Sequence, residues 1–468
     1  MSRTILPRTT LPLALLTSSL LAPLSAHANG LVAGAHRLDV PNHADTGAVA
    51  LLDTEAVGNQ GTTMFGDQML LPPPQAGQRA GLAVALGDFN DDGYQDLAVG
   101  VPLEDSFQPD TGGVYIYLGN SMGYGGPTWM TASFFGAAEE LGNHFGRALA
   151  VGDFDGDGVD DLAIGAPRAH SATNHQSGLV FVAYGSGGGL VADPSSSTIS
   201  PSGDFDNARF GFSLTTGDIE SDGSDELAIG APTYKQSGDT LGAVEVRRLD
   251  STGQSFDLAY DAFGSPTSCD GSPISTWFGW ALTFGNFDSD NELDLAIGAP
   301  GYQTPCYAGR VHVLHTTAAD QELHYAYPND RFGYALAAGP LGGQSRDTLV
   351  VGAPQSSPEG VDKAGEVYVF KSNDQGFNGS GWTLDPMNFG HHANSQKFGC
   401  SVAVGDFGSG TIDLAVGAKR AKDSRGIRTG GVFHYAHSLI PRGPMISPWD
   451  DLGVDANAGA LFGSSLAH

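Results

Sequence analysis

Positively charged residues are scarce in this chain of 468 residues, in which 22 Lys and Arg stand against 52 Asp and Glu and the formal net charge is −30. This balance argues against nucleic-acid binding, which needs a basic face. With only three cysteines, an exported chain would hold at most one internal disulfide. Beyond the N-terminal region no stretch approaches 18 apolar residues, so we expect no transmembrane segment.

Helical periodicity is also missing, because no segment after the N-terminal region sustains a 3.6-residue period over three turns. Glycine, in contrast, is abundant, with 67 residues, and 40% of the chain is hydrophobic, enough for a core. Many glycines and few charges favour short strands and tight turns. The excess of carboxylates calls for counter-ions, and a divalent metal is the first candidate.

Residues 1–28 have the composition of a secretory signal peptide. Arg3 and Arg8 give a positive start, an apolar run follows from Leu11 to Leu24, and Ala26-His27-Ala28 matches a signal-peptidase site. The alternative is an ordinary apolar strand. We therefore expect an exported protein (periplasmic, cell-surface or extracellular) whose mature part, residues 29–468, is a single domain.

One phrase recurs along the chain. It is clearest between Phe145 and Pro167, where it reads FG, then GDxxxDGxxDLAxGAP, and a second apolar phrase, GxV, follows. The glycine of FG, or of its weaker forms, falls at positions 81, 146, 211, 279, 333, 399 and 463. The segments are short, rich in Val, Ile and Ala, and bounded by Gly, Asp and Pro, which is typical of strands. The spacing predicts four-stranded propeller blades, each with a weaker outer strand such as Trp129–Phe135.

The two ends of the chain complete the count of repeats. Residues 461–467 form an FG strand with nothing after it, and residues 30–36 resemble a GAP strand with nothing before it. We expect these strands to pair and to close an all-β, seven-bladed propeller, which would remove the exposed strand edges. A linear solenoid is the alternative, but it would not need a split repeat.

These residues resemble the FG-GAP repeat family, the repeats of the integrin α-subunit N-terminal propeller. The resemblance covers essentially all of the chain after residue 28. It implies a seven-bladed β-propeller with calcium in some hairpin loops and a role in cell adhesion or ligand recognition, and it does not supply the partner.

The loops between FG and GAP strands carry the strongest chemical signal. Side-chain oxygens at positions 1, 3, 5 and 9 and a carbonyl at position 7 can wrap Ca²⁺, which takes six to eight oxygens. Position 6 must turn sharply and holds glycine, or Asn291 in loop four. The expected ligands of up to four calcium ions are Asp88, Asn90, Asp92, Tyr94 and Asp96 in loop one; Asp153, Asp155, Asp157, Val159 and Asp161 in loop two; Asp218, Glu220, Asp222, Ser224 and Glu226 in loop three; and Asn286, Asp288, Asp290, Glu292 and Asp294 in loop four.

Several alternatives apply to these loops. They could be Asx-rich turns without metal, but four in phase favour metal. An EF-hand would run to a twelfth-position Glu followed by a helix, whereas here a strand follows position 9. Loops three and four should bind more weakly than loop two, because loop three carries longer Glu side chains and loop four begins with Asn. Loops five and six have lost most carboxylates, and we expect the metal to be structural.

No catalytic set is evident. Residues 119–123 match GxSxG, but Tyr124-Gly125-Gly126-Pro127 forbids the helix that a hydrolase elbow requires. We therefore expect no enzyme, with one alternative: a propeller of a hydrolase or carbohydrate-processing system, such as glycosylphosphatidylinositol-specific phospholipase D. A Cys269–Cys306 disulfide is plausible because the two cysteines flank one predicted hairpin at the same end. Cys400 should be a small packed residue.

The hairpins divide the predicted propeller into two faces. Calcium loops lie on one, and the variable loops after the GAP strands lie on the other, where binding usually occurs. We expect a protein or glycan ligand on this second face, bound by a monomer. The loop residues considered are Phe107, His170, His175, Tyr234, Lys235, Tyr302 and Arg425.

Overall fold

We analysed a computed structural model of the chain. It describes residues 31–37, 46–52, 68–70, 78–261, 275–446 and 464–467; within the two long ranges it leaves out 105–108, 122, 139, 141, 171–175, 194–196, 203–204, 237, 250–257, 304–305, 317, 325–326, 378–380, 392, 408–410, 437 and 440–444. The predicted signal peptide, Phe107, His175 and Cys269 lie outside the described residues.

The second repeat shows how the sequence builds one sheet. Strand β10 (Ala148–Gly152) follows FG, β11 (Asp161–Ala166) is the GAP strand, β12 (Leu179–Ala183) carries the next apolar phrase, and β13 (Thr198–Ile199) lies outermost. All neighbours are antiparallel, and the register pairs Ala148 with Gly165 and Gly152 with Asp161. The predicted calcium loop, residues 153–161, therefore lies at one end of the β10–β11 hairpin, and the FG and GAP motifs lie at the other. We call this loop and its equivalents in the other sheets metal-type loops.

Five further sheets repeat this plan from continuous stretches of the chain. They comprise β4 (Ala83–Gly87), β5 (Asp96–Val101), β6 (Gly113–Tyr117) and β9 (Thr128–Met130); β14 (Ser213–Gly217), β15 (Glu226–Ala231), β17 (Asp239–Arg247) and β18 (Leu258–Asp261), with β16 (Lys235–Gln236) and β19 (Ser275–Phe278) also on β17; β20 (Ala281–Gly285), β21 (Asp294–Ala299), β22 (Arg310–Leu314) and β23 (Gln321–Leu323); β24 (Ala335–Gly339), β25 (Thr348–Ala353), β26 (Glu366–Asn373), β27 (Gly376–Phe377) and β28 (Trp382–Leu384); and β29 (Phe398–Gly405), β30 (Asp413–Ala418) and β31 (Val432–Tyr435).

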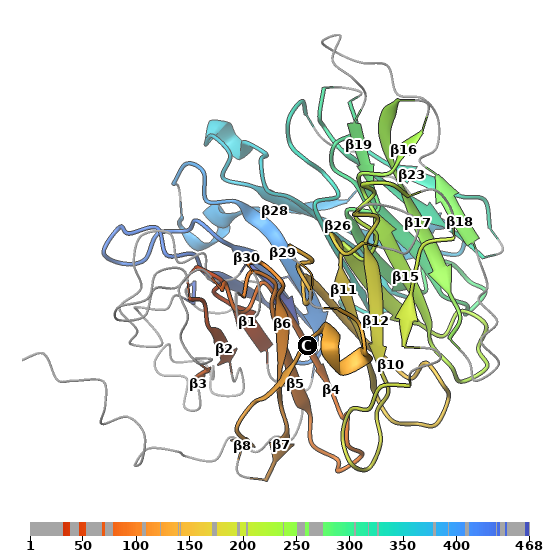
Figure 1. The fold of residues 1–468 in the computed structure, drawn as a ribbon. Helices are drawn as coiled ribbons and strands as arrows, with labels where there is room; N and C mark the ends of the chain where they lie inside the picture. Colours follow the sequence, from red (N-terminus) through yellow and green to blue (C-terminus); the bar gives the residue numbers. More distant parts are fainter. Residues whose placement is uncertain are drawn as a thin grey trace, which may run out of the picture.

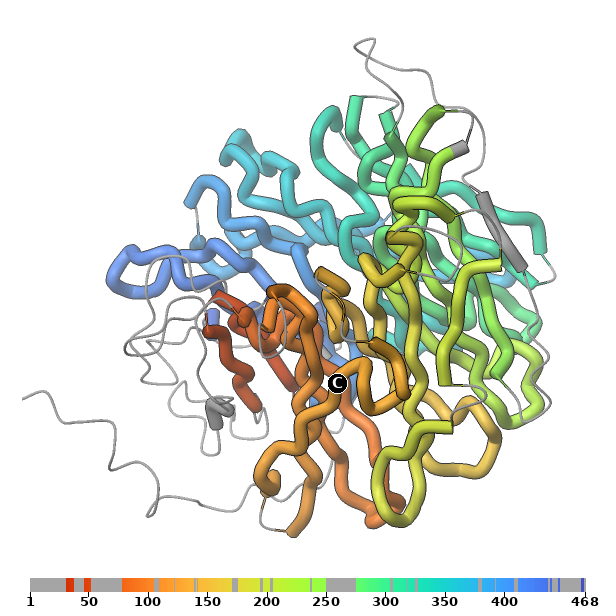
Figure 2. The backbone as a smooth tube through the Cα atoms, in the orientation of Figure 1, coloured from red at the N-terminus to blue at the C-terminus, as the bar shows by residue number. Residues whose placement is uncertain are grey.

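The remaining large sheet joins strands from both ends of the chain. Strands β1 (Leu31–Gly34), β2 (Val49–Leu52) and β3 (Gln68–Leu70) pair in sequence, and β32 (Leu466–Ala467) pairs antiparallel with β1. The sheets follow one another around the molecule, and the C-terminal strands return beside β1 (Figures 1 and 2). Each innermost strand contacts the innermost strand of the next sheet in the order β4, β10, β14, β20, β24 and β29. The fold is an all-β propeller.

The motif glycines hold adjacent sheets together. A Cβ atom on Gly165 of the GAP motif would lie 2.0 Å from the carbonyl oxygen of Gly211, the FG glycine of the next sheet. Gly211 itself has φ +81°, a conformation that L side chains rarely adopt. Glycine is therefore required at both positions, first for close approach of two backbones and second for backbone conformation.

One predicted strand is wrong in its extent. The outer strand expected over Trp129–Phe135 ends at Met130, and Ala132–Phe135 form a 3-10 helix, η2, closed by Gly136 in the left-handed region at φ 71°. The other described helices, η3 (Pro358–Gly360) and η4 (Pro386–Phe389), are equally short. Among the described residues, no helix has the length and apolar character needed to cross a membrane.

Candidate metal loops

The hairpin loops are anchored on two sides. Position 2 holds a fully buried phenylalanine in loops one, two and four, namely Phe89, Phe154 and Phe287. The backbone N–H of this phenylalanine donates to the carboxylate at position 9, for example Phe154 to Asp161 Oδ2 at 2.8 Å. The hydrogen bond from the buried phenylalanine thus fixes the position-9 carboxylate beside the loop, independently of any bound ion.

Loop two gathers carboxylates most closely. One oxygen each of Asp153, Asp155 and Asp161 lie within 4.8 Å of one another. Asp153 accepts the backbone N–H groups of Gly156 and Gly158, both at 2.8 Å, so the turn is shaped around its side chain. Positions 1, 3 and 9 therefore converge as the spacing predicts.

Asp157, at position 5 of loop two, does not join the converging carboxylates. Its Oδ1 accepts the N–H of Val159 at 2.9 Å. Its ligand role, like that of the Val159 carbonyl, stays a prediction.

The electrostatics of loop two favour a cation. Burial raises the pKa of Asp161 to about 7, against the lowering effect of N–H donors from Gly185 and Phe154, and the charges of Asp155 and Asp153 raise it further. Burial also raises the pKa of Asp155, together with the charges of Asp157 and Asp153. A divalent cation would compensate this repulsion, because it favours the ionised carboxylates.

Loop one shares the hydrogen bonds of loop two, but its carboxylates do not form a converging group of three among the described residues. Asp88 accepts N–H groups from Asp92 and Gly93 at 3.1 and 2.8 Å, and Asp96 accepts the N–H of Phe89 at 3.0 Å. Burial raises the pKa of Asp96 to about 6. The amide of Asn90 donates to Asp92 Oδ2 at 3.1 Å, so positions 3 and 5 contact each other. The Tyr94 carbonyl stays a predicted ligand.

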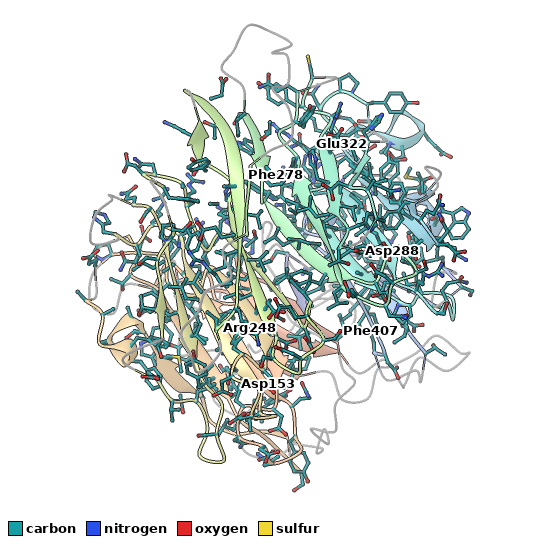
Figure 3. All side chains as sticks on the ribbon, turned by 90° about the vertical axis from the view of Figure 1, so that its right-hand side faces the viewer. Asp153, Arg248, Phe278, Asp288, Glu322 and Phe407 are labelled. Atoms are coloured by element: carbon teal, nitrogen blue, oxygen red, sulfur yellow. The ribbon has the colours of Figure 1, made fainter. Side chains whose placement is uncertain are left out.

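Loop three already has a cation from the protein. Arg248, the residue after β17, forms ion pairs with both Glu220 and Asp222, the predicted ligands at positions 3 and 5. Figure 3 shows Arg248 and Asp153 close together in the same part of the molecule. Asp218 accepts the N–H groups of Asp222 and Gly223 at 3.0 and 2.9 Å, as Asp153 does in loop two. Loop three therefore has the same turn as loop two, but the guanidinium group of Arg248 neutralises two of its carboxylates.

Position 9 of loop three is also distinctive. Burial raises the pKa of Glu226 to about 7, and its buried Oε1 has no hydrogen-bond partner among the described residues. The Ser224 carbonyl stays a predicted ligand, and its N–H donates to Asp222 Oδ1 at 3.1 Å.

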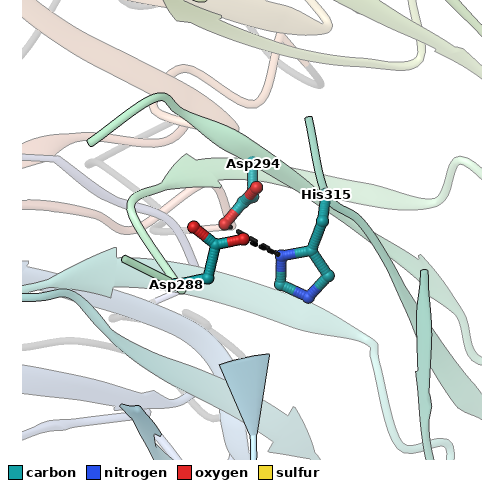
Figure 4. A group of neighbouring side chains, drawn as sticks. All are labelled: Asp288, Asp294 and His315. Carbon is teal, nitrogen blue, oxygen red and sulfur yellow. Dashed lines mark ion pairs between the residues drawn. The ribbon is translucent and has the colours of Figure 1, made fainter. Parts of the chain in front are cut away.

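Loop four brings a histidine to two carboxylates. His315 Nδ1 lies 3.4 Å from Asp288 Oδ2 and 3.1 Å from Asp294 Oδ2, and all three residues are buried (Figure 4). The buried atoms Asn286 Oδ1 and Asp288 Oδ2 have no hydrogen-bond partner in the part of the chain that the structure describes. Asp290 turns instead to Thr316, whose hydroxyl donates to it at 3.1 Å. Asn291, with φ 66°, makes the predicted turn, and the Glu292 carbonyl stays a predicted ligand.

The chemistry of this donor set differs from that of loop two. Oxygen-only sites suit calcium, whereas an imidazole beside carboxylates suits first-row transition metals such as zinc. Sequence reasoning missed His315 because it lies 21 residues beyond Asp294, although the register pairing Leu295 with Leu314 places it at the loop.

Position 8, which we had not considered, connects neighbouring sheets. Asp225 Oδ2 accepts the backbone N–H of Asp153 at 3.0 Å, and the N–H of Asp225 donates to the Asp153 carbonyl at 2.7 Å. Asp160 and Asp347 likewise accept the position-1 N–H groups of Asp88 and Asn286, at 2.7 and 2.9 Å. In loops one, two and four, position 1 is therefore oriented by the next repeat along the chain.

Other sequence candidates are resolved by their local structure. Gly119–Asn120 and Gly123–Tyr124 form the two short strands β7 and β8, a hairpin in place of the strand–helix elbow of serine hydrolases. Cys400 is buried, as expected of a small packed residue, and its Sγ contacts the Gly417 carbonyl and the Lys419 N–H. The Cys269–Cys306 disulfide stays a prediction, since Cys269 lies outside the described residues. Position 9 of loop six, Asp413, contacts His434 Nε2 at 2.9 Å.

Comparison with known proteins agrees with this architecture. Residues 80–117, 145–182 and 278–314 match the FG-GAP repeat model. Human phosphatidylinositol-glycan-specific phospholipase D is 29% identical over 300 residues, which cover 59% of this chain and 35% of the relative. Drosophila melanogaster integrin alpha-PS2 is 30% identical over 244 residues, which cover 49% of this chain and 16% of the relative.

The chain thus spans about a third of the length of the phospholipase and about a sixth of the integrin. Among solved structures, a rhamnogalacturonan lyase of Bacillus licheniformis shares 13% sequence identity with this chain, and the match covers 90% of this chain and 72% of the lyase with a TM-score of 0.35.

Proposed function

We propose, from its FG-GAP repeats and its relation to integrin alpha chains and to phosphatidylinositol-glycan-specific phospholipase D, that this chain is an exported, calcium-stabilised propeller that recognises a ligand. The convergence of Asp153, Asp155 and Asp161 in loop two is the observation that carries the calcium assignment. Calcium would hold these carboxylates together and stiffen the hairpin, leaving the opposite face for recognition.

The proposal assigns different states to the four loops. Loops one and two would hold calcium, because none of the described residues forms an ion pair with their carboxylates. Loop three would be held by Arg248, and loop four, through His315, would prefer a transition metal to calcium. The spacing predicts up to four calcium sites, and this assignment leaves two of them, in loops one and two.

The proposal also includes seven-bladed closure. Strand β32 contacts both β4 and β29, the first and last of the innermost strands in the series, and it pairs with β1. These contacts support a seventh blade built from both ends of the chain. Export would follow from residues 1–28.

The chain would act by binding and not by catalysis. A hydrolase-associated role is the alternative, because one relative is a phospholipase, but this chain covers only 35% of it. Two experiments on the purified protein separate these roles: a screen for hydrolase activity and a pull-down from cell-surface material. Substrate turnover without capture of any cell-surface ligand would overturn the recognition role.

Thermal unfolding with and without EGTA tests the calcium role. We expect Tm to fall in EGTA and to recover with calcium at about 10⁻³ M or below, the range of extracellular modules. The bound-calcium count should be close to two per chain. An unchanged Tm together with no bound calcium would refute the calcium assignment.

A further inference from the structure

The end of the propeller opposite the hairpin loops carries a belt of aromatic and cationic side chains. The residues that follow successive FG glycines contact one another: Arg147 lies over Phe212 at 4.4 Å, Phe212 packs on Trp280 at 4.7 Å, and Trp280 packs on Tyr334 at 5.4 Å. Lys419, which replaces the proline of a GAP motif, lies over Tyr334 at 5.4 Å. The belt therefore crosses five consecutive sheets: its first four residues directly precede the innermost strands, and Lys419 directly follows β30.

A second row of side chains flanks this belt. In the six repeats where the structure describes it, the residue two positions before the FG-type glycine has a positive φ, between 54° and 63°, and most of these residues are basic. This shared backbone conformation directs one residue from each repeat toward the same end of the molecule. The row consists of Arg79, His144, Arg209, Trp277, Arg331 and Lys397.

These cations gather without carboxylate partners. Among the residues described, Arg79, Arg147, Arg209, Arg331, Lys397 and Lys419 form no ion pair. Their proximity is reflected in His144, whose pKa is lowered to about 4, first by burial and then by the charges of Arg168, Arg147, Arg209 and Arg79. In a chain with 22 basic and 52 acidic residues, unpaired cations at one end require an explanation.

A polar cavity opens beside this belt. Its volume is about 440 Å³, and its lining includes Arg168, Arg209, Lys235, Trp277, Gln176 and Asn207. Trp277 stacks on Trp280 at 5.3 Å with an interplanar angle of 28°, and Arg331 lies 4.5 Å over the Trp277 ring. The cavity thus combines basic groups, amides and an aromatic surface.

We propose that this face, defined by Arg168, Arg209, Lys235 and Trp277, binds an acidic saccharide. Unpaired guanidinium groups suit carboxylates, with which they form bidentate hydrogen bonds. Amide side chains suit sugar hydroxyls, and an aromatic surface suits the apolar face of a sugar ring. The inference rests on the proposed recognition function, and names its ligand class.

The overall negative charge does not prevent this binding. The Debye length at physiological ionic strength is about 8 Å, so distant carboxylates are largely screened while cations in the cavity are not. An acidic peptide would satisfy the cations as well, but it would make less use of the amides and the indole ring. We therefore favour the saccharide and use the peptide as a competitor in the test.

The test is calorimetric titration of the calcium-loaded chain, at fixed free calcium, with a tetramer of glucuronic acid and with its methyl ester. We expect the acid to bind at least about tenfold tighter than the ester, and Arg209→Gln and Lys235→Gln each to weaken it about tenfold. The matched control is Arg310→Gln, since Arg310 is already paired with Glu322. This variant should bind as the unmodified chain does.

Three results would overturn the inference: equal binding of acid and ester, unchanged binding by Arg209→Gln, or tighter binding of a glutamate tetramer than of the saccharide. Each titrated protein is also unfolded with and without EGTA. Failure to bind the saccharide with an intact calcium effect refutes only the ligand class, whereas loss of the calcium effect in the unmodified chain refutes the proposed calcium role.

Discussion

Loops two and three have nearly the same backbone hydrogen bonds, but their carboxylates have different neighbours. In both, the position-1 aspartate accepts two or more loop N–H groups and position 6 is glycine at positive φ. Loop two then leaves three carboxylates facing one another, whereas loop three directs two to Arg248. The same turn thus forms both where carboxylates face one another and where a guanidinium group pairs with them.

Loops two and three differ in the residue that follows the third strand of the sheet, which strand register places beside the loop. Leu162 pairs with Ala183 and Leu227 with Arg247, so Tyr184 in the second repeat corresponds to Arg248 in the third. His315 has the same place in the fourth repeat, because Leu295 pairs with Leu314. This position therefore decides which side chain faces the loop carboxylates.

The largest difference should come from removing position 1. In calcium, Asp153→Ala should lower stability more than Asp218→Ala by about 2.7 kcal/mol when free calcium is 100-fold above Kd, since only loop two loses an ion. Chemical denaturation of both variants with and without EGTA measures this. The gap should close in EGTA; a gap that persists would mean that the backbone contacts and not the metal distinguish the loops.

The contact between repeats should have the next largest effect. Asp225→Leu removes the acceptor of the Asp153 N–H and leaves it unsatisfied, at a cost of about 1–3 kcal/mol. Calcium affinity at loop two should fall as well, because Asp153 loses its orientation. Leu293, which occupies position 8 of loop four, shows that leucine fits there. Unchanged urea stability and calcium affinity would contradict this prediction.

Removing the internal cation should convert loop three. Arg248→Met keeps most of the side-chain stem and frees Glu220 and Asp222, so we expect one additional bound calcium per chain and a larger loss of Tm in EGTA. Calcium counting by equilibrium dialysis measures it, with Arg310→Met as the matched control. An unchanged count would show that loop three lacks a usable ligand set even when open.

The smallest effect concerns metal preference. Loop four should take up zinc ahead of calcium, and His315→Asn should lower the zinc count by one while the calcium count stays the same. His434→Asn is the control, since His434 meets one loop carboxylate, Asp413. Equal zinc uptake by both variants and the unmodified chain would place zinc elsewhere.

Local chemistry allowed much of this molecule to be predicted. The strands, the hairpins and the turn at Asn291 follow from spacing and from backbone conformations that only a few residue types tolerate. The outer strand over Trp129–Phe135 was predicted too long, because apolar composition alone does not distinguish a strand from the 3-10 turn that Gly136 closes. Outer strands have few partners, so their extent depends on weaker contacts.

The sequence by itself determined the repeat, the all-β architecture and the carboxylate-rich loops, because each depends on residues within one hairpin. The tertiary structure alone decided which loops meet a protein cation, since Arg248 and His315 reach their loops only through strand register. It also decided that unpaired cations from several repeats share one end of the propeller. Charge compensation acts through space, and distance along a chain does not measure it.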